Sequence, residues 1–161
     1  LALYIDAQNT LWAGKWNQGL WRMPLDDIWK PDAMVERIEG VTNTVANIYQ
    51  DSAGAIWTSA RHVARPISRV VGDTVTYFSS ESTGGGLPSD RVLSFQEGPD
   101  GLLYLGTSSG LALISIPRRT RSVSSQANRR KQAFWPKPGC EAPEPCDFVL
   151  MMLRLRNRNG L

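Results

Sequence analysis

Few residues in this chain have both the type and the spacing that site chemistry requires. The 161 residues include one histidine, His62, and two cysteines, Cys140 and Cys146. A catalytic serine or cysteine needs a base beside it, and one isolated imidazole offers no triad, so His62 is expected to be an ordinary surface residue. Two thiols without nearby histidines do not complete a four-ligand zinc site, although they could close a short disulfide of the kind found in exported proteins. We therefore expect no metal and no cofactor.

The sequence also lacks the motifs typical of phosphate binding and of glycoside hydrolysis. The glycines at 84–86 precede an apolar run that is typical of a strand, whereas a phosphate-binding loop leads into a helix. No Walker or dinucleotide-binding motif occurs. Glycoside hydrolysis needs two carboxylates around one cleft, and no such pair stands out. The chain is therefore expected to be non-catalytic by itself.

The best candidates for binding are cationic, aromatic and hydroxyl side chains that follow three similar segments. They are Lys15, Trp16, Ser59, Arg61, Thr107 and Ser108. Cations pair with carboxylate or sulfate and an indole stacks on a sugar ring, so this mixture suits an acidic oligosaccharide. Ordinary solvated turns are the alternative. The binding hypothesis requires the three segments to place these residues on one rim of the fold.

Large aromatic residues recur in the three segments at a nearly constant period. These anchors are Trp12, Trp57 and Tyr104, which are 45 and 47 residues apart. Three positions before each anchor stands a turn-forming residue, namely Asn9, Gly54 and Gly101. Self-similarity at a fixed period indicates one supersecondary unit used repeatedly. Equivalent positions of such a unit face the same way, which would give the candidate residues a common rim.

The repeating unit is predicted to be a β-meander. In the third copy, apolar runs at 91–97, 102–105 and 111–116 are separated by turn sequences rich in glycine. Glycine supplies the positive φ that tight hairpin turns need, and short runs between turns are typical of strands. A unit of three or four antiparallel strands that repeats about every 40–50 residues is typical of a propeller blade. Residues 32–38 are the only stretch in which a short helix is an alternative to a strand.

The three aromatic anchors are expected in the core. A large side chain in the middle of each blade's inner strand fills the wedge between neighbouring sheets and buries roughly 150–250 Å². We predict that Trp12, Trp57 and Tyr104 occupy equivalent buried positions. An exposed aromatic platform for sugar stacking is the alternative.

The third copy resembles a known repeat. Residues 86–92 (Gly-Leu-Pro-Ser-Asp-Arg-Val), residues 100–107 (Asp-Gly-Leu-Leu-Tyr-Leu-Gly-Thr) and the pair Gly110-Leu111 resemble the repeat of the two-component-regulator propeller family. The resemblance covers roughly residues 3–116. The first copy has Asn-Thr where Asp-Gly is usual. The second lacks the Gly-Thr and Gly-Leu pairs, which predicts either an irregular outer half or a divergent surface in that blade.

The resemblance implies a function as well as a fold. It implies a ligand-sensing, non-catalytic propeller segment of a bacterial two-component signalling protein, on the periplasmic or extracellular face of a membrane sensor. The implied partners are the rest of a larger propeller and a downstream signalling domain. The candidate residues themselves add an oligosaccharide or other small ligand as the expected partner at the loop ends. A propeller glycosidase or lyase, and a scaffold propeller that binds another protein, are the alternatives.

Charge divides the chain into two parts. Residues 1–116 contain 8 Lys and Arg against 12 Asp and Glu, whereas residues 117–161 contain 10 against 3. Low apolar content with like charge is typical of disorder. We predict an all-β fold, a partial β-propeller of about three antiparallel blades (approximate repeats 1–39, 40–86 and 87–116). A poorly ordered, basic, proline-containing tail or linker follows at 117–161, in which 148–153 forms a short strand or helix.

Two further partner classes are not expected. The basic tail lacks the interleaved aromatic residues that stack on bases, which argues against nucleic acid. The longest wholly apolar run, 148–153, is far shorter than the roughly 20 residues of a membrane-spanning helix, and no signal peptide is visible. We therefore predict no nucleic-acid partner and no membrane span in this segment.

Overall fold

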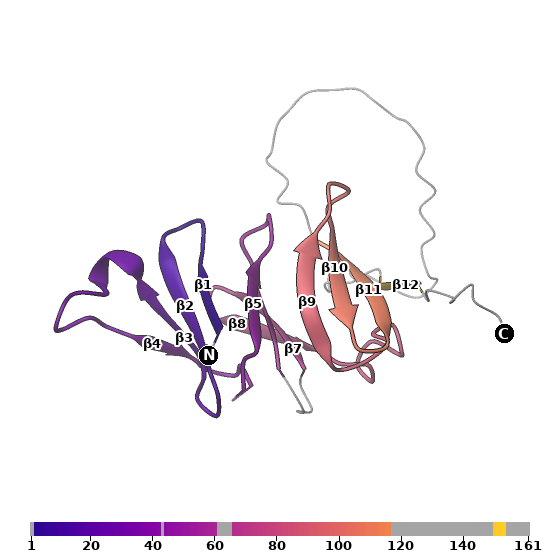
Figure 1. Cartoon of the computed structure of the whole chain (residues 1–161), viewed down its shortest axis with the longest axis horizontal. Coiled ribbons are helices and arrows are strands. Elements are labelled where there is room, and N and C mark those ends of the chain that lie inside the picture. The colour runs from indigo at the N-terminus through magenta and orange to yellow at the C-terminus, as the bar shows by residue number, and fades with distance from the viewer. Residues whose placement is uncertain (1, 43, 61–65, 117–149, 154–161) are drawn as a thin grey trace, which may run out of the picture.

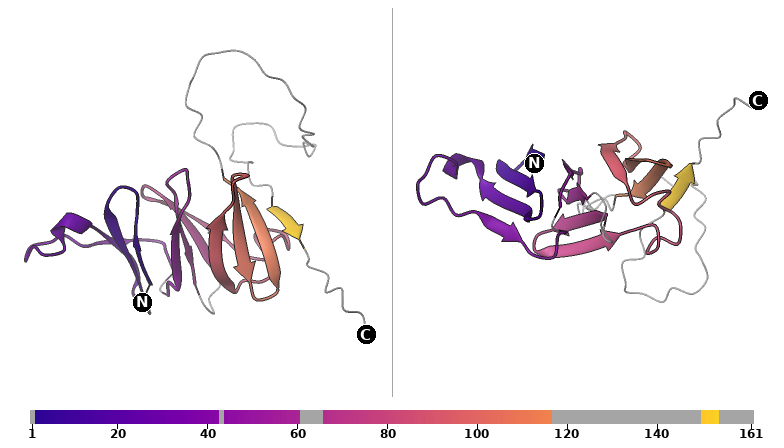
Figure 2. Two further views of the ribbon diagram at one scale, coloured as in Figure 1. Left: turned by 45° about the horizontal axis from the view of Figure 1, so that its top comes forward. Right: turned by 60° about the horizontal axis from the view of Figure 1, so that its bottom comes forward.

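Three four-stranded antiparallel sheets stand side by side in chain order (Figure 1). They are seen in a computed structural model that describes residues 2–42, 44–60, 66–116 and 150–153. Within each sheet the strands pair in the order in which they occur along the chain. Figure 2 shows the second sheet standing between the first and the third. The predicted all-β fold, a partial β-propeller of three antiparallel blades, is confirmed.

The strand bounds are as follows. The first sheet contains β1 (Ala2–Ile5), β2 (Thr10–Lys15), β3 (Gly19–Pro24) and β4 (Glu36–Ile38), with a short 3₁₀ helix η1 (Leu25–Asp27) after β3. The second contains β5 (Asn47–Gln50), β6 (Ile56–Ser59), β7 (Ile67–Val71) and β8 (Thr74–Phe78). The third contains β9 (Val92–Glu97), β10 (Leu102–Thr107), β11 (Gly110–Ser115) and β12 (Leu150–Leu153).

The third sheet takes its last strand from beyond residue 117. β12 pairs with β11 in antiparallel register, from Leu111 opposite Leu153 to Ile114 opposite Leu150. The apolar run at 148–153, expected as a strand or a helix, is therefore a strand over 150–153. These four residues belong with the third blade, although the domain boundary proposed from charge put them in the tail. The rest of the predicted tail, including Cys140 and Cys146, lies outside the described residues.

Local sequence explains the hairpins that begin each blade. The turn before each anchor strand contains a residue with positive φ, at 62° in Asn9, 86° in Gly54 and 76° in Gly101. Asparagine and glycine tolerate this conformation better than other residues. The chain can therefore reverse within a few residues and bring β1 against β2, β5 against β6, and β9 against β10.

Residues 32–38, for which a short helix was an alternative to a strand, end in the strand β4. Ile38 pairs with Leu20 and is 5% exposed, while Glu36 pairs with Arg22 on the neighbouring strand. The Glu36 carboxylate accepts a hydrogen bond from Arg22 Nε at 2.7 Å. Pairing with β3 buries Ile38 and gives the Glu36 carboxylate a hydrogen-bond donor. Tertiary contacts therefore make this segment a strand.

The second blade is complete despite its missing Gly-Thr and Gly-Leu pairs. β7 pairs with β6 over four consecutive positions and β8 pairs with β7 over five, without a register shift. An irregular outer half was one of two possibilities, and the described strands exclude it. Residues 61–65, which include Arg61 and His62, lie outside the described residues.

Two hydrophobic cores lie between the three sheets. Trp12, Leu20, Val45, Ile56 and Val70 belong to the core between the first and second sheets. Trp57 packs with residues of the third sheet in the other core, including Val92, Leu103, Leu105 and Ile114. Trp12 is 5% exposed and Trp57 is 0% exposed. Each of these anchors fills the space between its own sheet and the next, as predicted.

Two details of the anchor prediction are corrected. The anchors stand on β2, β6 and β10, the second strand of each sheet, whereas the first strands β1, β5 and β9 approach one another across the sheets. Tyr104 is half-buried, unlike Trp12 and Trp57. Its ring faces away from the second sheet, because its neighbours Leu103 and Leu105 supply the face that packs on Trp57.

Gly14 allows the first two blades to approach closely. A Cβ at this position would lie 2.4 Å from Val45 Cγ1, so Val45 would have to shift to accommodate it. Val45 is 3% exposed and belongs to the segment that leads into β5. The valine of one repeat therefore packs directly on the glycine of the preceding one.

Candidate functional site

The hairpins of the three blades define two opposite rims. The turns before β2, β6 and β10 lie at the top of Figure 1, and the turns that follow β2 and β10 lie at the bottom. We call the first the acidic-turn rim (residues 6–9, 51–55 and 98–101) and the second the strand-end rim (15–19 and 107–110, with the described end of β6 at 59–60). Five of the six binding candidates from the sequence lie at the strand-end rim or at the strand ends that border it, and the sixth, Arg61, lies outside the described residues.

Lys15 and Trp16 form the exposed part of the first strand end. Lys15 is exposed and its Nζ lies 5.7 Å from the centroid of the Trp21 ring. Trp16 is 65% exposed, so most of its indole is available to a ligand. Trp21 Nε1 donates to the Gln18 carbonyl at 2.9 Å, which fixes the ring beneath the lysine. A cation and two indoles therefore lie close together at this turn.

The third strand end contributes hydroxyl groups. Thr107 is half-buried and its Oγ1 donates to the Gly110 carbonyl at 2.8 Å. Ser108 is exposed, with its Oγ 2.9 Å from that of Ser89. The Ser108 N–H donates to the Arg91 carbonyl at 3.0 Å, which ties the turn to the segment leading into β9. Ser89 was not among the sequence-based candidates, but it extends this hydroxyl pair.

The second strand end differs from the expectation. Ser59 is 0% exposed, and its Oγ accepts a 2.8 Å hydrogen bond from Asn47 Nδ2. A buried, hydrogen-bonded hydroxyl does not reach a ligand at the rim, so Ser59 acts within the blade. Arg61 lies outside the described residues. Among the described candidates, Lys15, Trp16, Thr107 and Ser108 remain for binding.

The acidic-turn rim carries a contact that recurs in every blade. Asp6 Oδ2 accepts a hydrogen bond from Trp12 Nε1 at 2.7 Å, and Asp51 Oδ2 accepts one from Trp57 Nε1 at 2.7 Å. The other oxygen of each carboxylate accepts the backbone N–H two residues before the anchor, from Thr10 at 2.8 Å in the first blade. The carboxylate therefore fastens the turn to the anchor.

The third blade builds the same contact from a different position. Tyr104 reaches Asp100 Oδ2 with its hydroxyl at 2.7 Å, and Asp100 is four residues before the anchor instead of six. Gly98 stands at the position equivalent to Asp6 and Asp51. A Cβ on Gly98 would lie 2.6 Å from Tyr104 Cε2, so the tyrosine ring occupies the space of the missing side chain.

This contact shifts both titrations in the third blade. The hydrogen bond from Tyr104 holds the pKa of the Asp100 carboxyl below its ordinary value, with a smaller contribution from the Leu102 N–H. The same hydrogen bond raises the pKa of the Tyr104 phenol, because ionising the phenol removes its proton from the carboxylate. The pair is most stable with the carboxylate ionised and the phenol neutral.

Arginines lie over the anchors of the first two blades. Arg22 Cζ is 5.9 Å from the centroid of Trp12, and Arg69 Cζ is 5.7 Å from that of Trp57. Each arginine is the cross-strand partner of its tryptophan. In the third blade the partner of Tyr104 is Leu113. The chain therefore uses an Asp–Trp–Arg arrangement twice and an Asp–Tyr–Leu arrangement once.

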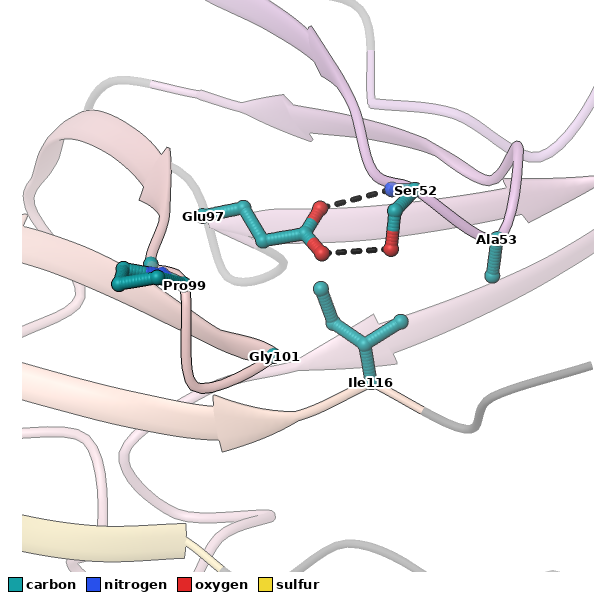
Figure 3. A pocket seen from close by; sticks show the side chains of 7 residues that line it. Ser52, Ala53, Glu97, Pro99, Gly101 and Ile116 are labelled. Carbon is teal, nitrogen blue, oxygen red and sulfur yellow. Dashed lines mark hydrogen bonds between the residues drawn. The ribbon is translucent and has the colours of Figure 1, made fainter.

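A cavity of about 300 Å³ opens between the second and third acidic turns (Figure 3). It is lined by Ser52, Ala53, Glu97, Gly98, Pro99, Gly101 and Ile116. The Glu97 carboxylate accepts hydrogen bonds from the Ser52 N–H at 2.7 Å and the Ser52 Oγ at 2.5 Å. Both carboxylate oxygens are thus engaged by one residue of the preceding blade, and they link the two blades instead of facing a ligand.

A second cavity of about 500 Å³ lies beside the anchor of the first blade. It is lined by Asp6, Gln8, Thr10, Trp12, Arg22, Met23, Pro24, Met34 and Glu36. Arg22 binds Glu36 at 2.7 Å and Asp73 of the second blade at 3.2 Å. The bond to Glu36 raises the pKa of the Arg22 guanidinium. This cation already has two carboxylate partners, so the strand-end rim is the stronger candidate for an acidic ligand.

Sequence reasoning did not identify the residues that join the blades. Gln50 joins the first two blades, since its Oε1 accepts the Ala7 N–H at 2.9 Å and its Nε2 donates to Gln8 Oε1 at 2.9 Å. Gln50 and Glu97 each stand seven positions before an anchor, and a column of long polar side chains at that spacing could have signalled their role. Arg22 and Arg69 carried no such signal, because their relation to the tryptophans depends on strand register.

The described residues contain neither a cluster of metal ligands nor a membrane-spanning helix. Within residues 2–42, 44–60 and 66–116, no three His, Cys, Asp or Glu side chains gather as metal ligands would. In the described portion, no helix is long and apolar enough to cross a membrane.

Solved structures of bacterial surface proteins share this fold. PorZ, an essential bacterial surface component of the type-IX secretion system of Porphyromonas gingivalis, matches 68% of this chain with a TM-score of 0.56 and 20% identity. The extracellular domain of the hybrid two-component system BT4673 from B. thetaiotaomicron matches 71% with a TM-score of 0.57 and 16% identity. That of BT3049 from the same organism matches 70% with a TM-score of 0.53 and 22% identity.

The likeness is one of fold. The chain spans 16% of the length of each of these proteins. No family model and no curated protein sequence matches it. The extracellular domains of two hybrid two-component systems are consistent with the resemblance to the two-component-regulator propeller family, at the level of architecture.

Proposed function

We propose that this chain is a ligand-sensing β-propeller segment of a bacterial two-component signalling protein, without catalytic activity of its own. The observation that supports this most is its fold, which it shares with the extracellular domains of BT4673 and BT3049. A sensor domain binds its ligand outside the membrane and passes the signal on, so the periplasmic or extracellular side and a downstream signalling domain form part of the proposal.

The proposed ligand site is the strand-end rim. Lys15 offers a cation and Trp16 an indole that is 65% exposed. Thr107 and Ser108 offer hydroxyl groups from the third blade, and Ser89 adds a further one. A cation pairs with carboxylate or sulfate, an indole stacks on a sugar ring, and hydroxyls exchange hydrogen bonds with sugar hydroxyls. An acidic oligosaccharide therefore fits the chemistry of this rim.

Isothermal titration calorimetry of the chain with an oligogalacturonate and with a sulfated oligosaccharide tests this proposal. A neutral oligosaccharide of the same length controls for stacking alone. Lys15→Ala and Trp16→Ala should each weaken binding by about tenfold, which corresponds to about 1.4 kcal/mol. The Arg61→Ala variant belongs in the same series, because Arg61 was predicted at this rim.

Matched controls come from the segment between β3 and β4. Trp29 is 91% exposed, and Lys30 pairs with Asp27 at 2.5 Å, so Trp29→Ala and Lys30→Ala remove the same side-chain types far from the rim. These controls should leave affinity unchanged. Unchanged affinity in all the rim variants would remove the strand-end rim from consideration.

The alternatives are separated by the same measurements. A propeller glycosidase or lyase needs a pair of carboxylates near the bound sugar, and the rim residues named above include none. Detectable cleavage of either oligosaccharide would overturn the non-catalytic assignment. Failure of every oligosaccharide to bind would favour a scaffold propeller whose partner is another protein.

A further inference from the structure

The first blade has a longer connection between its third and fourth strands than the second blade has. Residues 25–35 separate β3 from β4, whereas only residues 72–73 separate β7 from β8. In repeat proteins, insertions into single copies form loops that often belong to the binding face. The insertion contains Met34, which lines the cavity of about 500 Å³ beside Trp12. We call this cavity the first-blade cavity.

The first-blade cavity lies on the face of the first sheet that packs on the second sheet. Trp12 belongs to the core between these two sheets. Arg22 pairs with Trp12 in strand register and Glu36 pairs with Arg22, so the three side chains share one face. Arg22 also reaches Asp73 of the second blade at 3.2 Å. The cavity therefore belongs to a junction between two blades that are both part of this chain.

The polar lining of the cavity is specific to the first blade. At the equivalent positions of the second blade, three polar lining residues are replaced by smaller ones: Gln8 by Ala53, Thr10 by Ala55 and Glu36 by Thr76. The Asp–Trp–Arg arrangement, in contrast, is common to both blades. The shared residues hold the turn against the core. The residues that differ are therefore candidates for a role that only the first blade has.

Carboxylates outnumber cations around the cavity. Asp6 and Glu36 line it together with Arg22, and Asp73 adjoins it through its bond to Arg22. Only one oxygen of Glu36 is engaged by Arg22, and no described residue donates to the other, Oε1. The hydrogen bond from Arg22 holds the pKa of the Glu36 carboxyl below its ordinary value, so this group is ionised at neutral pH. An anion here would be repelled by three carboxylates, whereas a cation would be attracted.

Apolar side chains form the rest of the lining. They include the Trp12 indole, the Pro24 ring and the Met34 thioether. Met34 is 85% exposed, and its flexible side chain can adapt to the shape of a bound molecule. Pockets for small molecules have volumes of roughly 300–1,000 Å³ and combine apolar walls with a few polar groups. The volume and lining of the first-blade cavity agree with this description.

We propose that the first-blade cavity binds a small organic amine. The ammonium group donates to Glu36 Oε1, and the apolar part of the ligand packs on Met34 and Pro24. A primary alkyl amine is protonated at neutral pH, as the lysine side chain is. This site lies beside the acidic-turn rim, so it is distinct from the oligosaccharide site proposed at the strand-end rim and does not depend on it.

NMR titration of the full chain with phenethylamine tests the proposal. The Trp12 Nε1–H, which donates to Asp6 at 2.7 Å, and the Met34 methyl group provide local readouts. Both signals should shift and saturate. The Trp57 Nε1–H makes the equivalent contact with Asp51 in the second blade and should not move. 2-Phenylethanol and 3-phenylpropionate carry the same ring without a positive charge, so each should bind at least about tenfold more weakly.

Variants of the lining assign the two halves of the ligand. Glu36→Gln keeps an acceptor for Arg22 but removes the charge, so it should weaken phenethylamine binding by about tenfold. Met34→Ala should weaken it about threefold, because it removes apolar contact area. Glu39→Gln is the matched control, since Glu39 is 81% exposed and outside the lining. Trp29→Ala controls for the insertion itself. Neither control should change the affinity.

Several results would overturn the proposal. The absence of a saturable shift at Trp12 and Met34 would exclude the site. Equal binding of the amine and the alcohol, or tighter binding of the acid, would exclude recognition of a cation. These comparisons use the wild-type chain, so they do not depend on the folding of any variant. A Glu36→Gln chain that binds phenethylamine as tightly as wild type would contradict the role assigned to Glu36.

Discussion

Asp51 Oδ2 lies 2.7 Å from Trp57 Nε1, in a turn where the aspartate is 4% exposed and the tryptophan is 0% exposed. The other carboxylate oxygen accepts the Ala55 N–H at 2.8 Å. One side chain thus satisfies a buried backbone donor and a buried side-chain donor, and it sets the distance between the turn and the core of the blade. The same arrangement recurs with Asp6 and Trp12.

Asp51→Ala should lower the free energy of unfolding by about 3 kcal/mol, because two buried donors lose their acceptor. Asp51→Asn keeps one acceptor oxygen and should cost roughly half as much. Urea unfolding followed by tryptophan fluorescence measures both. Asp73→Ala is the control, since Asp73 is 90% exposed and its contact with Arg22 should contribute at most about 1 kcal/mol. Equal effects at positions 51 and 73 would contradict the role assigned to Asp51.

The three anchors should differ in their contribution to stability. Trp57→Ala should cost about 3–5 kcal/mol, because its side chain is fully buried between two sheets. Tyr104→Ala should cost clearly less, because that ring is half-buried. Denaturant unfolding of the two variants under the same conditions compares them. A Tyr104→Ala variant as unstable as Trp57→Ala would contradict the partial burial assigned to Tyr104.

Gly98 and Tyr104 should be energetically coupled. Gly98→Asp alone should destabilise the chain by about 1–3 kcal/mol, because its Cβ would meet the tyrosine ring. The double variant Gly98→Asp with Tyr104→Trp recreates the pairing of Asp6 with Trp12, so part of that loss should return. A double-mutant cycle measures the coupling, which should exceed about 0.5 kcal/mol. Additive effects would mean that the two arrangements are not interchangeable solutions of one turn.

Acid should weaken the turn of the third blade. The pKa of Asp100 is depressed in the folded chain by the hydrogen bond from Tyr104. A group with a depressed pKa stabilises the fold above its unfolded pKa, and that contribution disappears as the pH falls through the folded pKa, here below about pH 4. Tyr104→Phe should therefore raise the pKa of Asp100. Carboxyl chemical shifts measured by NMR during an acid titration test this, and an unchanged pKa would contradict the assigned cause.

The contact between Glu97 and Ser52 should tolerate only substitutions that keep an acceptor. Gln50 makes the equivalent contact between the first and second blades, where it accepts the Ala7 N–H. Glu97→Gln mimics Gln50, so its unfolding free energy should stay within about 0.5 kcal/mol of wild type. Glu97→Leu loses both hydrogen bonds and should cost about 1–2 kcal/mol. Hydrogen exchange at the Ser52 amide provides a local readout, and protection should persist in Glu97→Gln and fall in Glu97→Leu.

The sequence by itself determined the repeat and most of the blade. Large aromatics at a nearly constant spacing, preceded by Asn9, Gly54 and Gly101, were sufficient to predict antiparallel hairpins, because turn conformation and strand alternation depend on residues close in the chain. The buried positions of Trp12 and Trp57 followed from the same pattern. The order of the strands in the sheet did not, so the anchors were assigned to the inner strand, although they stand on the second.

Only the tertiary structure decided which side chains meet across blades and which lie open. Ser59 was grouped with Thr107 as a hydroxyl near a strand end, yet it is buried against Asn47. Glu97 reaches Ser52 across 45 residues, and β12 joins β11 from a segment that composition assigned to the tail. Such contacts depend on the packing of one sheet on another and on strand register, and local spacing carries no information about either. The repeat can therefore be predicted from the sequence, whereas the contacts between its copies depend on how the sheets pack.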